Sequence, residues 1–230
     1  MDNSLMPILS EIPLFKNVAP QTLTALAEKG LIDQFPAGHH VFYDKDKVHC
    51  FYILLSGTAS LYKTNSNGQN KIIFIEDNGT LLNEVIFEDL PASINCQTLS
   101  PCKMLIFYKN DFIELMKKDF ILTQNVMNAL TKRVRRLYRQ LKNATSIIKI
   151  EKKIAAKLWK LGKDYGVPCE KGIKINFSIT VTSLADLLGS YRETVSRALK
   201  LLIQKELIIY ENKQIIIPNP DALSKFFKTL

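Results

Sequence analysis

Apolar and polar residues alternate in short runs along the first half of the chain, with turn-forming residues between the runs. Gly and Asn mark these turns, as at Asn65–Gly68 and Asn78–Gly79. Strands of about five residues at regular spacing favour an antiparallel all-β unit, either a small β-barrel or a sandwich. A short helix over 20–27, with Pro20 in its first turn, precedes them. The predicted strands are 40–43, 50–55, 59–63, 71–75 and 104–108.

From Asn110 the apolar spacing becomes that of a helix, which Asn110 or Asp111 can cap. No Pro or Gly interrupts residues 110–144, which gives a helix about 50 Å long. Since one small domain does not cover such a length, we expect the helix to pair with a second copy of the chain. The alternative is an amphipathic helix that packs within its own domain. The predicted seam, with steps of three and four, is Val126, Leu130, Val134, Leu137 and Leu141.

The polar residues 143–146 end this pattern and are the candidate hinge. A further helix is predicted over 150–163, and Gly162, Gly166 and Pro168 are expected to end it. The chain therefore divides into a β-domain (1–109), a dimerisation helix with the hinge (110–145), and a C-terminal domain (146–230).

Residues 180–189 predict a short helix followed by a glycine turn. Thr180 or Thr182 can cap this helix, and small Ala185 allows a second helix to approach closely. Gly189 ends the helix at a position where a positive φ costs little. Three leucines are expected to bury one face: Leu184, Leu187 and Leu188.

The next residues predict a second helix, because Ser190 and Glu193 fit the S-x-x-E capping box. Two short helices joined by a tight glycine turn form a helix-turn-helix. Two apolar runs, 207–210 and 214–217, then flank a turn and predict a hairpin, the wing of a winged helix, with Lys213 at its tip near a phosphate. The apolar stripe of the second helix is Val195, Leu199 and Leu202.

The polar side of the second helix lies near its N-terminus, the end that enters the major groove of DNA in this motif. Arginine can bridge guanine O6 and N7, and glutamate can accept from cytosine N4. We therefore expect a base-reading set that favours G·C pairs. This set is Arg192, Glu193, Ser196 and Arg197. The other expected DNA contacts are Thr182, Ser190, Tyr191 and Lys213.

The formal charge of +9 divides unevenly, with a net −4 over residues 1–130 and +13 over 131–230, which favours a polyanionic partner for the second half. No uncharged run reaches the roughly 18 residues of a membrane-spanning helix, and the acidic start lacks a secretory signal. Four cysteines without C-x-x-C spacing indicate reduced thiols. We expect a cytoplasmic protein with no membrane partner.

These motifs resemble the CRP/FNR superfamily of bacterial transcription regulators over nearly the whole chain. Stretches 184–189 and 190–197 carry the resemblance in the C-terminal half. In the first half it rests on Gly38, on Phe51–Gly57, on Gly68, and on Gly79 five residues before Glu84. The resemblance implies an α+β fold: an N-terminal antiparallel β-barrel or jelly-roll sensor domain, a long dimerisation helix and a C-terminal winged helix-turn-helix domain.

The same resemblance implies a homodimer that binds double-stranded DNA at a palindromic promoter site and contacts RNA polymerase. It assigns the base-reading role to Arg192, Glu193 and Arg197, and it implies that a signal in the N-terminal domain switches the protein. Adaptor proteins that bind acidic partners through basic helices are the competing class. Detectable enzymatic turnover is not expected, since no phosphate-binding loop, dinucleotide-binding or zinc-protease motif is present.

The resemblance also places a pocket for a small-molecule effector in the first half. In members that bind cyclic AMP, a Gly-Glu pair is followed about ten residues later by Arg-Ser or Arg-Thr. Glu84 is present here, but Asn83 takes the Gly position and Ala92 takes the Arg position. A buried phosphate without a cation is costly, so we do not expect cyclic AMP. Another effector, or an effector-independent regulator with a vestigial pocket, stays open. The pocket residues are Leu82, Asn83, Glu84, Val85, Ala92 and Ser93.

Cofactor and metal sites are not evident. Residues 1–49 contain no cysteine for an iron–sulfur cluster. His39, His40 and His49 are expected at the surface rather than as haem ligands. Cys96 and Cys102, six positions apart, are either a thiol switch or small semi-buried residues that flank a loop.

Overall fold

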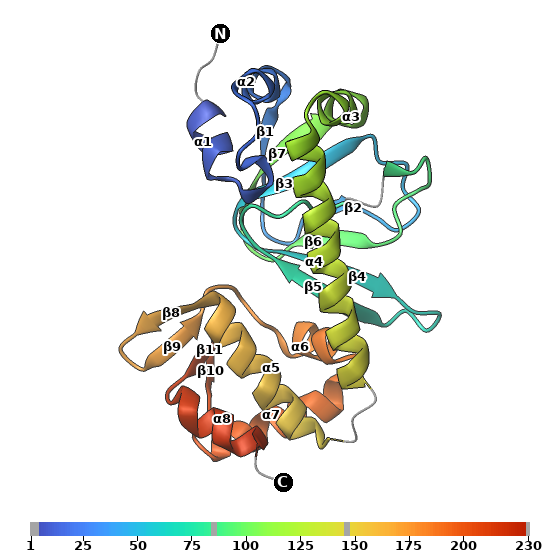
Figure 1. Cartoon of the computed structure of the whole chain (residues 1–230). Helices are drawn as coiled ribbons and strands as arrows, with labels where there is room; N and C mark the ends of the chain where they lie inside the picture. Colours follow the sequence, from blue (N-terminus) through green and yellow to red (C-terminus); the bar gives the residue numbers. More distant parts are fainter. Residues whose placement is uncertain (1–4, 84–86, 145–147, 229–230) are drawn as a thin grey trace. The chain divides into compact units, whose positions relative to one another are not determined.

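The computed structural model describes residues 5–83, 87–144 and 148–228, without the side chains of 142–144 (Figure 1). The chain forms two compact units. The first unit consists of Met1–Tyr62 and Phe74–Ser146, and the second of Lys63–Ile73 and Ile147–Leu230. The two sheets of the N-terminal half and the helices α6 and α7 (Val181–Leu188 and Arg192–Gln204) of the C-terminal half confirm the α+β class.

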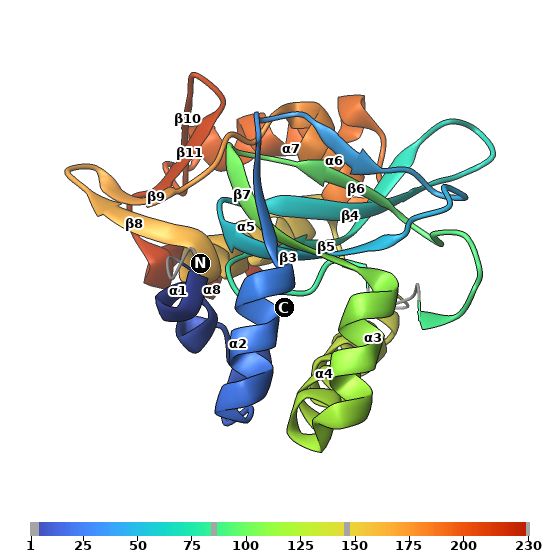
Figure 2. The same cartoon turned by 90° about the horizontal axis from the view of Figure 1, so that it is seen from above.

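Strands of the N-terminal half form two antiparallel sheets, ordered β1-β7-β3 and β2-β6-β4-β5. Figure 2 shows them from above. Closing a barrel requires the edge strands to pair, and within the described residues the edges of these sheets do not, so the pair stays open. The antiparallel all-β prediction is confirmed, and its closed-barrel form is wrong. The strands are β1 (Leu31–Phe35), β2 (His40–Phe42), β3 (Cys50–Ser56), β4 (Ala59–Thr64), β5 (Asn70–Glu76), β6 (Asn95–Thr98) and β7 (Cys102–Tyr108).

Two of these strands, β1 and β6, were not predicted, because their sequences LIDQF and NCQT carry little apolar alternation. Each instead pairs along its full length with a partner strand: β1 pairs with β7, and β6 pairs with β4. Their strand conformation therefore depends on tertiary pairing rather than on local propensity.

Three short helical segments precede the sheets: α1 (Leu5–Glu11), η1 (Pro13–Phe15) and α2 (Pro20–Lys29). Pro20 occupies the first turn of α2, as predicted, since its missing N–H is not needed there. Aromatic rings join helix and sheet in the core. Phe112 lies 5.0 Å from Phe51 and 5.4 Å from Phe107 between ring centroids.

The predicted single helix over 110–144 is broken into α3 (Lys109–Lys118) and α4 (Phe120–Ala144). Buried Asp119 makes the break. Its Oδ1 accepts from the amides of Ile121 (2.9 Å) and Leu122 (3.2 Å), which caps α4, and its Oδ2 accepts from the Ala19 amide at 2.9 Å. The predicted caps are also wrong, because Tyr108 precedes α3 without a side-chain cap and Asp111 pairs with Lys29.

Helix α4 packs against its own unit along its first half, which corrects the predicted seam. Val126 is 1% exposed and belongs to the core, and Leu130 packs against the same core. Val134, Leu137 and Leu141 are exposed. The intradomain alternative therefore holds at the start of the helix, while the second half of α4 leaves apolar side chains uncovered.

The second unit surrounds helix α5 (Ile150–Tyr165). Gly162 does not end this helix, as had been expected: it is buried within α5, where an added Cβ would lie 2.5 Å from Ile217 Cδ1. Gly166 ends the helix by turning to an extended conformation (φ −80°, ψ 141°), and glycine is needed there because an added Cβ would lie 2.0 Å from the Gly162 carbonyl oxygen. The other elements are β8 (Gly166–Cys169), β9 (Gly172–Ile175), α6 (Val181–Leu188), α7 (Arg192–Gln204), β10 (Ile209–Glu211), β11 (Gln214–Ile217) and α8 (Pro220–Lys228).

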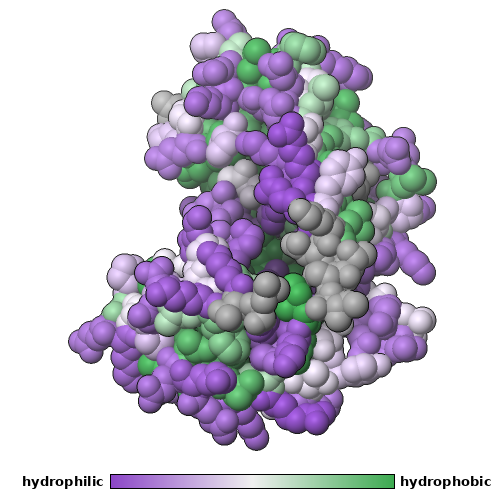
Figure 3. All heavy atoms as spheres, turned by 60° about the horizontal axis from the view of Figure 1, so that its bottom comes forward, coloured by the Kyte–Doolittle hydropathy of each residue, from purple (hydrophilic) through white to green (hydrophobic). Residues whose placement is uncertain are grey.

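Hydrophilic residues cover much of the face seen in Figure 3, with smaller hydrophobic patches between them. None of the helices that the structure describes is both long and apolar enough to span a lipid bilayer.

Candidate nucleic-acid interface and effector region

The first helix of the predicted helix-turn-helix, α6, is capped by Thr180. Its Oγ1 accepts from the Ser183 amide at 3.0 Å, and the Ser183 hydroxyl accepts from the Thr180 amide at 2.8 Å. This reciprocal pair identifies Thr180, rather than Thr182, as the cap of α6. Thr182 is a residue of the helix itself, and its side chain is exposed. Leu184 and Leu187 are buried as expected, while Leu188 is half-buried. Burial raises the pKa of Asp186 on the same helix.

The turn after α6 uses Gly189 in the left-handed region, with φ 61° and ψ 47°. The Ser190 amide donates to the Ala185 carbonyl at 3.1 Å, which closes the end of α6. Because Ser190 is committed to this turn, α7 begins one residue later, with Tyr191 at its N-cap and no side-chain cap. The predicted Ser190–Glu193 capping box is therefore wrong, although the turn and both helices form as predicted.

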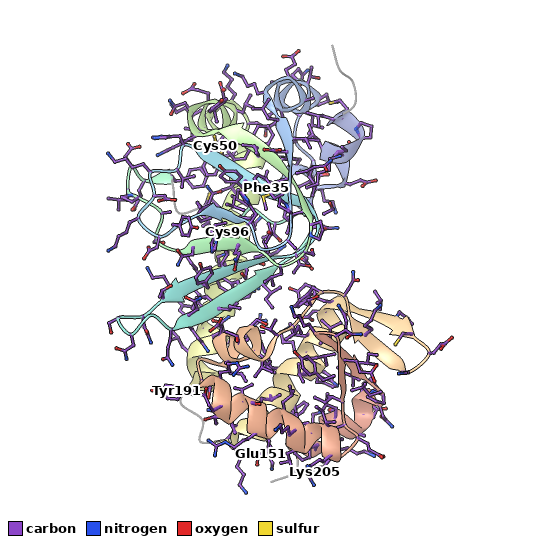
Figure 4. The ribbon with its side chains drawn as sticks, turned by 180° about the vertical axis from the view of Figure 1, so that it is seen from behind. Phe35, Cys50, Cys96, Glu151, Tyr191 and Lys205 are labelled. Carbon is purple, nitrogen blue, oxygen red and sulfur yellow. The ribbon has the colours of Figure 1, made fainter. Side chains whose placement is uncertain are left out.

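The start of α7 presents the predicted reading residues to solvent. Arg192, Glu193 and Arg197 are exposed, and Ser196 is half-buried. Tyr191 is 66% exposed at the N-terminal end of α7, and Lys205 lies just beyond the other end (Figure 4). The opposite face of the helix is buried through Val195, Ala198, Leu199 and Leu202. Two guanidinium groups flanking a carboxylate match the donors and acceptors on the edges of G·C pairs.

The predicted wing is present as the β10–β11 hairpin. Asn212 and Lys213 form its two-residue turn, with φ values of 50° and 62°. Such positive values characterise a type I′ turn. Lys213 is exposed at the tip, and its carbonyl accepts from the Ile179 amide at 2.7 Å. The sequence interpretation missed the β8–β9 hairpin beside β11, because Gly166 and Pro168 were taken only as helix breakers.

In the described part of the predicted effector pocket, the side chain of Asn83 is already hydrogen-bonded to the backbone of this chain. Asn83 is 1% exposed, its amide donates to the Cys50 carbonyl at 2.7 Å, and its oxygen accepts from the Tyr52 amide at 3.0 Å. Leu82 and Ala92 are buried, and Ser93 is exposed. Glu84 and Val85 lie outside the described residues. The Ala92 position therefore offers no cation for a phosphate.

A charged cluster that the sequence interpretation missed lies beside this region. Glu76, at the end of β5, is 3% exposed. Nη1 of Arg136 donates to its two carboxylate oxygens at 2.9 and 2.7 Å, and Nη2 of Arg133 donates to Oε1 at 3.3 Å. Both guanidinium groups lie over the Phe74 ring, 5.4 Å (Arg133) and 4.4 Å (Arg136) from its centroid. Arg133 and Arg136 face inward on α4, where the heptad pattern gave no sign of a partner.

A groove of about 660 Å³ lies along α4, next to η1 and the loop after β5. Basic residues line it at Lys16, Lys132, Arg133 and Arg136, and Leu81 lines it as well. None of the described residues of the predicted effector pocket lines this groove, so the two are separate features of the first unit.

The candidate thiols and metal ligands do not form a reactive or metal-binding arrangement within the described residues. All four cysteines are free, and burial raises the pKa of both Cys96 and Cys102, so neither forms a thiolate readily. His39 and His49 are exposed, and His40 accepts or donates a hydrogen bond with the Tyr62 hydroxyl at 3.0 Å. In the part of the chain that the structure covers, no group of three or more His, Cys, Asp or Glu residues could hold a metal ion.

Comparison with known families matches both halves of the chain. Residues 32–119 match the cyclic nucleotide-binding domain family, and residues 152–226 match the Crp-like helix-turn-helix domain family. The second match covers α6, α7 and the wing, and the first covers both sheets and α3. The whole of α4 lies between the two matched stretches.

Proteins that align with this chain over nearly their whole length are transcription regulators. A CRP-like cAMP-activated global transcriptional regulator of Mycobacterium tuberculosis is 22% identical over 219 residues, covering 95% of this chain and 97% of its own. A global nitrogen regulator of Nostoc is 22% identical over 223 residues, covering 96% and 99%. Among solved structures, the c-di-GMP-responsive global regulator CLP of Xanthomonas campestris matches with a TM-score of 0.75 at 17% identity, covering 87% of this chain and 100% of that one.

Proposed function

Because the chain belongs to the CRP/FNR family of transcription regulators, we propose that it is a homodimer that binds a roughly palindromic DNA site in a sequence-specific manner. The observation that carries this proposal is the exposed start of α7. There Arg192, Glu193 and Arg197 face solvent on a helix that is fixed by the glycine turn before it and the buried stripe beneath it. We assign phosphate contacts to Lys213, Thr182, Ser190 and Tyr191, and a further reading contact to Ser196.

The test of base reading is Arg192→Ala, measured as binding to a panel of duplexes selected from a random library. Loss of one bidentate guanine contact should cost about 1–3 kcal/mol at a single G·C pair and relax specificity there. Lys205→Ala is the matched control, since it removes one positive charge beyond the opposite end of α7. A loss that is equal on every duplex would contradict the reading role of Arg192.

We propose that dimerisation uses the exposed stripe of α4, which keeps Val134 and Leu141 of the seam predicted from the sequence and replaces its other members. Residues seven apart along the helix are uncovered, and Tyr138 lies between the last two of them. These residues are Phe120 (72% exposed), Met127 (55%), Val134 (42%), Tyr138 (67%) and Leu141 (66%). Spacings of three and four with a period of seven are those of a paired helix. A second copy is the fitting occupant, because it would place two recognition helices on one DNA site, about 34 Å apart.

Met127→Glu tests this register, because Met127 belongs to the exposed stripe and not to the seam predicted from sequence. We expect the variant to sediment as a monomer, since a carboxylate buried at a helix pair is costly. Asn128→Glu adds the same charge at an exposed neighbour outside the stripe and should remain dimeric. A wild-type chain that is strictly monomeric would overturn the dimer.

We propose that the signal received by the first unit is not cyclic AMP. Ala92 is buried where a phosphate partner would be needed, and the Asn83 amide is already bonded to Cys50 and Tyr52. One similar regulator is cAMP-activated and another is c-di-GMP-responsive, so the shared fold does not fix the ligand. A rise in melting temperature and in DNA affinity on adding cyclic AMP would contradict this.

An effector-independent regulator is the second candidate, and the Glu76 cluster favours it, because the α4 arginines already have an internal partner. DNA binding by ligand-free protein, measured beside a thermal-shift panel of small molecules, separates the two candidates. From family membership we further propose RNA polymerase as a partner and the bacterial cytoplasm, where the chromosome lies, as the place of action.

A further inference from the structure

We propose that the buried carboxylate of Glu76 acts as an internal ligand of the α4 arginines, beside the predicted effector pocket, and holds the second half of α4 in the position that dimerisation and DNA binding need. The inference rests on the proposed function and deepens its effector-independent form. Glu76 is a positioning residue in this role, since it acts on DNA through the arginines and α4.

The carboxylate is held as tightly as a bound ligand would be. Its side chain is 3% exposed, and both oxygens accept from Arg136, at 2.9 and 2.7 Å, while Oε1 also accepts from Arg133 at 3.3 Å. One nitrogen of Arg136, Nη1, spans both oxygens, and hydrogen bonds between charged groups are roughly twice as strong as neutral ones. The Phe74 ring covers the same two guanidinium groups.

The cluster also reaches the segment where the effector was expected. Arg133 donates through Nη2 to the Leu81 carbonyl at 2.9 Å and through Nη1 to the Leu82 carbonyl at 3.5 Å. Arg136 donates to the Ile75 carbonyl at 3.3 Å. The strand β5, the 81–82 segment and α4 are therefore joined through two arginines and one carboxylate, a connection that a ligand would otherwise have to make.

The described part of the molecule needs no outside ion to complete this network. No buried side-chain nitrogen or oxygen among the described residues lacks a hydrogen-bond partner. Removing Glu76 would change that, because two guanidinium groups would then face a cavity of carboxylate size. Arg133 is 14% exposed and Arg136 40%, so two like charges left there without their carboxylate are unfavourable, and the emptied site should take up a carboxylate anion in preference to chloride.

The position of the cluster along α4 explains why it should matter for DNA binding. Apolar packing of α4 against the core ends at Leu130. Arg133 and Arg136 come next, and the exposed stripe residues Val134, Tyr138 and Leu141 are interleaved with them or follow. The carboxylate thus fixes the stretch of helix that we expect to pair with the second copy.

The experiment is the Glu76→Ala variant, tested for DNA binding in sodium acetate and in sodium chloride at equal ionic strength. In chloride we expect the DNA dissociation constant to rise about tenfold or more. Acetate should restore most of the affinity, because its carboxylate fits the vacated site. Glu114→Ala, which removes a surface carboxylate paired with Lys117 on α3, is the control and should match wild type in both salts.

Glu76→Gln keeps the volume of the side chain and covers the case in which the alanine variant does not fold. It should bind DNA more weakly than wild type and gain nothing from acetate, since the amide fills the site. Wild-type affinity in both variants, or a folded alanine variant that acetate does not restore, would overturn the inference. If wild type binds no duplex, the proposed function fails. The inference about Glu76 is then tested on the dimer dissociation constant, which Glu76→Ala must raise and acetate must lower again.

Discussion

Helix α4 carries four arginines and α7 carries two, and the pair Arg133 and Arg136 on α4 has surroundings opposite to those of the α7 pair. On α7, Arg192 and Arg197 are exposed, and the carboxylate between them, Glu193, is exposed on the same helix. On α4, the side chains of Arg133 and Arg136 are 14% and 40% exposed, and both meet Glu76, a carboxylate supplied by the sheet.

This difference shows that the source of the carboxylate decides what an arginine does. A guanidinium without a buried partner keeps its donors for a base edge or a phosphate. A guanidinium bound to a buried carboxylate instead ties its helix to the sheet. Charge counted along the sequence does not distinguish the two cases, because both kinds of arginine contribute equally to the excess of +13 over residues 131–230.

Arg136→Ala should lower the free energy of unfolding more than any other variant considered below. It leaves Glu76 buried with only Arg133, at 3.3 Å, as its guanidinium partner. Breaking a buried ion pair costs about 3–5 kcal/mol, and the partial exposure of Arg136 lowers our expectation to about 2–3 kcal/mol. The measurement is urea unfolding followed by circular dichroism.

Arg192→Ala is the partner variant on α7, and it should change the free energy of unfolding by less than about 0.5 kcal/mol. Equal losses from the two substitutions would mean that both arginine pairs serve stability. In that case the distinction between a reading pair and a tethering pair would be lost.

Asp119→Ala should have the next largest effect, because it removes the cap of α4 and the acceptor for the Ala19 amide together. We expect a loss of about 2 kcal/mol, since a cap contributes about 1 and a buried unpaired N–H costs a similar amount. Asp111→Ala, which breaks only the surface pair with Lys29, should cost less than about 1 kcal/mol. Calorimetry of the two variants checks the difference.

The stabilisation by Asp119 should also depend on pH. Burial raises its pKa, but the amides of Ala19 and Leu122, with the Thr22 hydroxyl and the Ile121 amide, outweigh burial and hold the pKa below its ordinary value. The contribution is therefore complete above the unfolded pKa of about 3.9 and is lost as pH falls through the folded value. A difference between wild type and Asp119→Ala that grows on acidification would contradict this.

The helix-turn-helix could be predicted from sequence because its signals are local. Gly189, the α7 stripe and the wing lie within 40 residues of one another, and each agrees with the others. The mistakes at Asp119 and Glu76 have the opposite cause. The Asp119 carboxylate bonds the Ala19 amide 100 residues away, and Glu76 meets arginines 57 and 60 residues away. Spacing along one helix carries no information about such partners.

The seam was misplaced for a related reason. Steps of three and four occur on both the buried and the exposed face of α4, so the pattern alone does not say which face meets a second copy. Val126 lies on the buried face and Met127 on the exposed face, although they are neighbours in sequence. Only the tertiary packing of α4, against η1 and α3, decides between them.

Lys213→Gln sharpens the comparison within the second unit, by separating phosphate contact from base reading. The variant keeps a polar side chain at the wing tip, one atom shorter than lysine, and removes its charge. Binding should weaken by a similar factor on every duplex, and the slope of log affinity against log salt should fall by about 0.9 for each subunit. Arg192→Ala should instead act at one base pair. A sequence-dependent loss for Lys213→Gln would exchange the roles of the two residues.

Glu206→Gly should give the smallest effect, and of opposite sign to the others. Glu206 follows α7 with a φ of 56°, and it lies in the turn where the Leu207 amide donates to the Leu202 carbonyl at 3.0 Å. Glycine adopts this left-handed conformation without strain, although it also gains freedom in the unfolded chain. We expect a gain of about 0.5 kcal/mol in the free energy of unfolding. Unfolding can be followed through the fluorescence of Trp159, the one tryptophan of the chain, which lies on α5 in the same unit.

Lys205→Gly is the control, and at an ordinary φ of −86° it should instead destabilise the protein by a similar amount. Two losses would show that the end of α7 does not strain Glu206, and that the helix is fixed by its buried stripe alone.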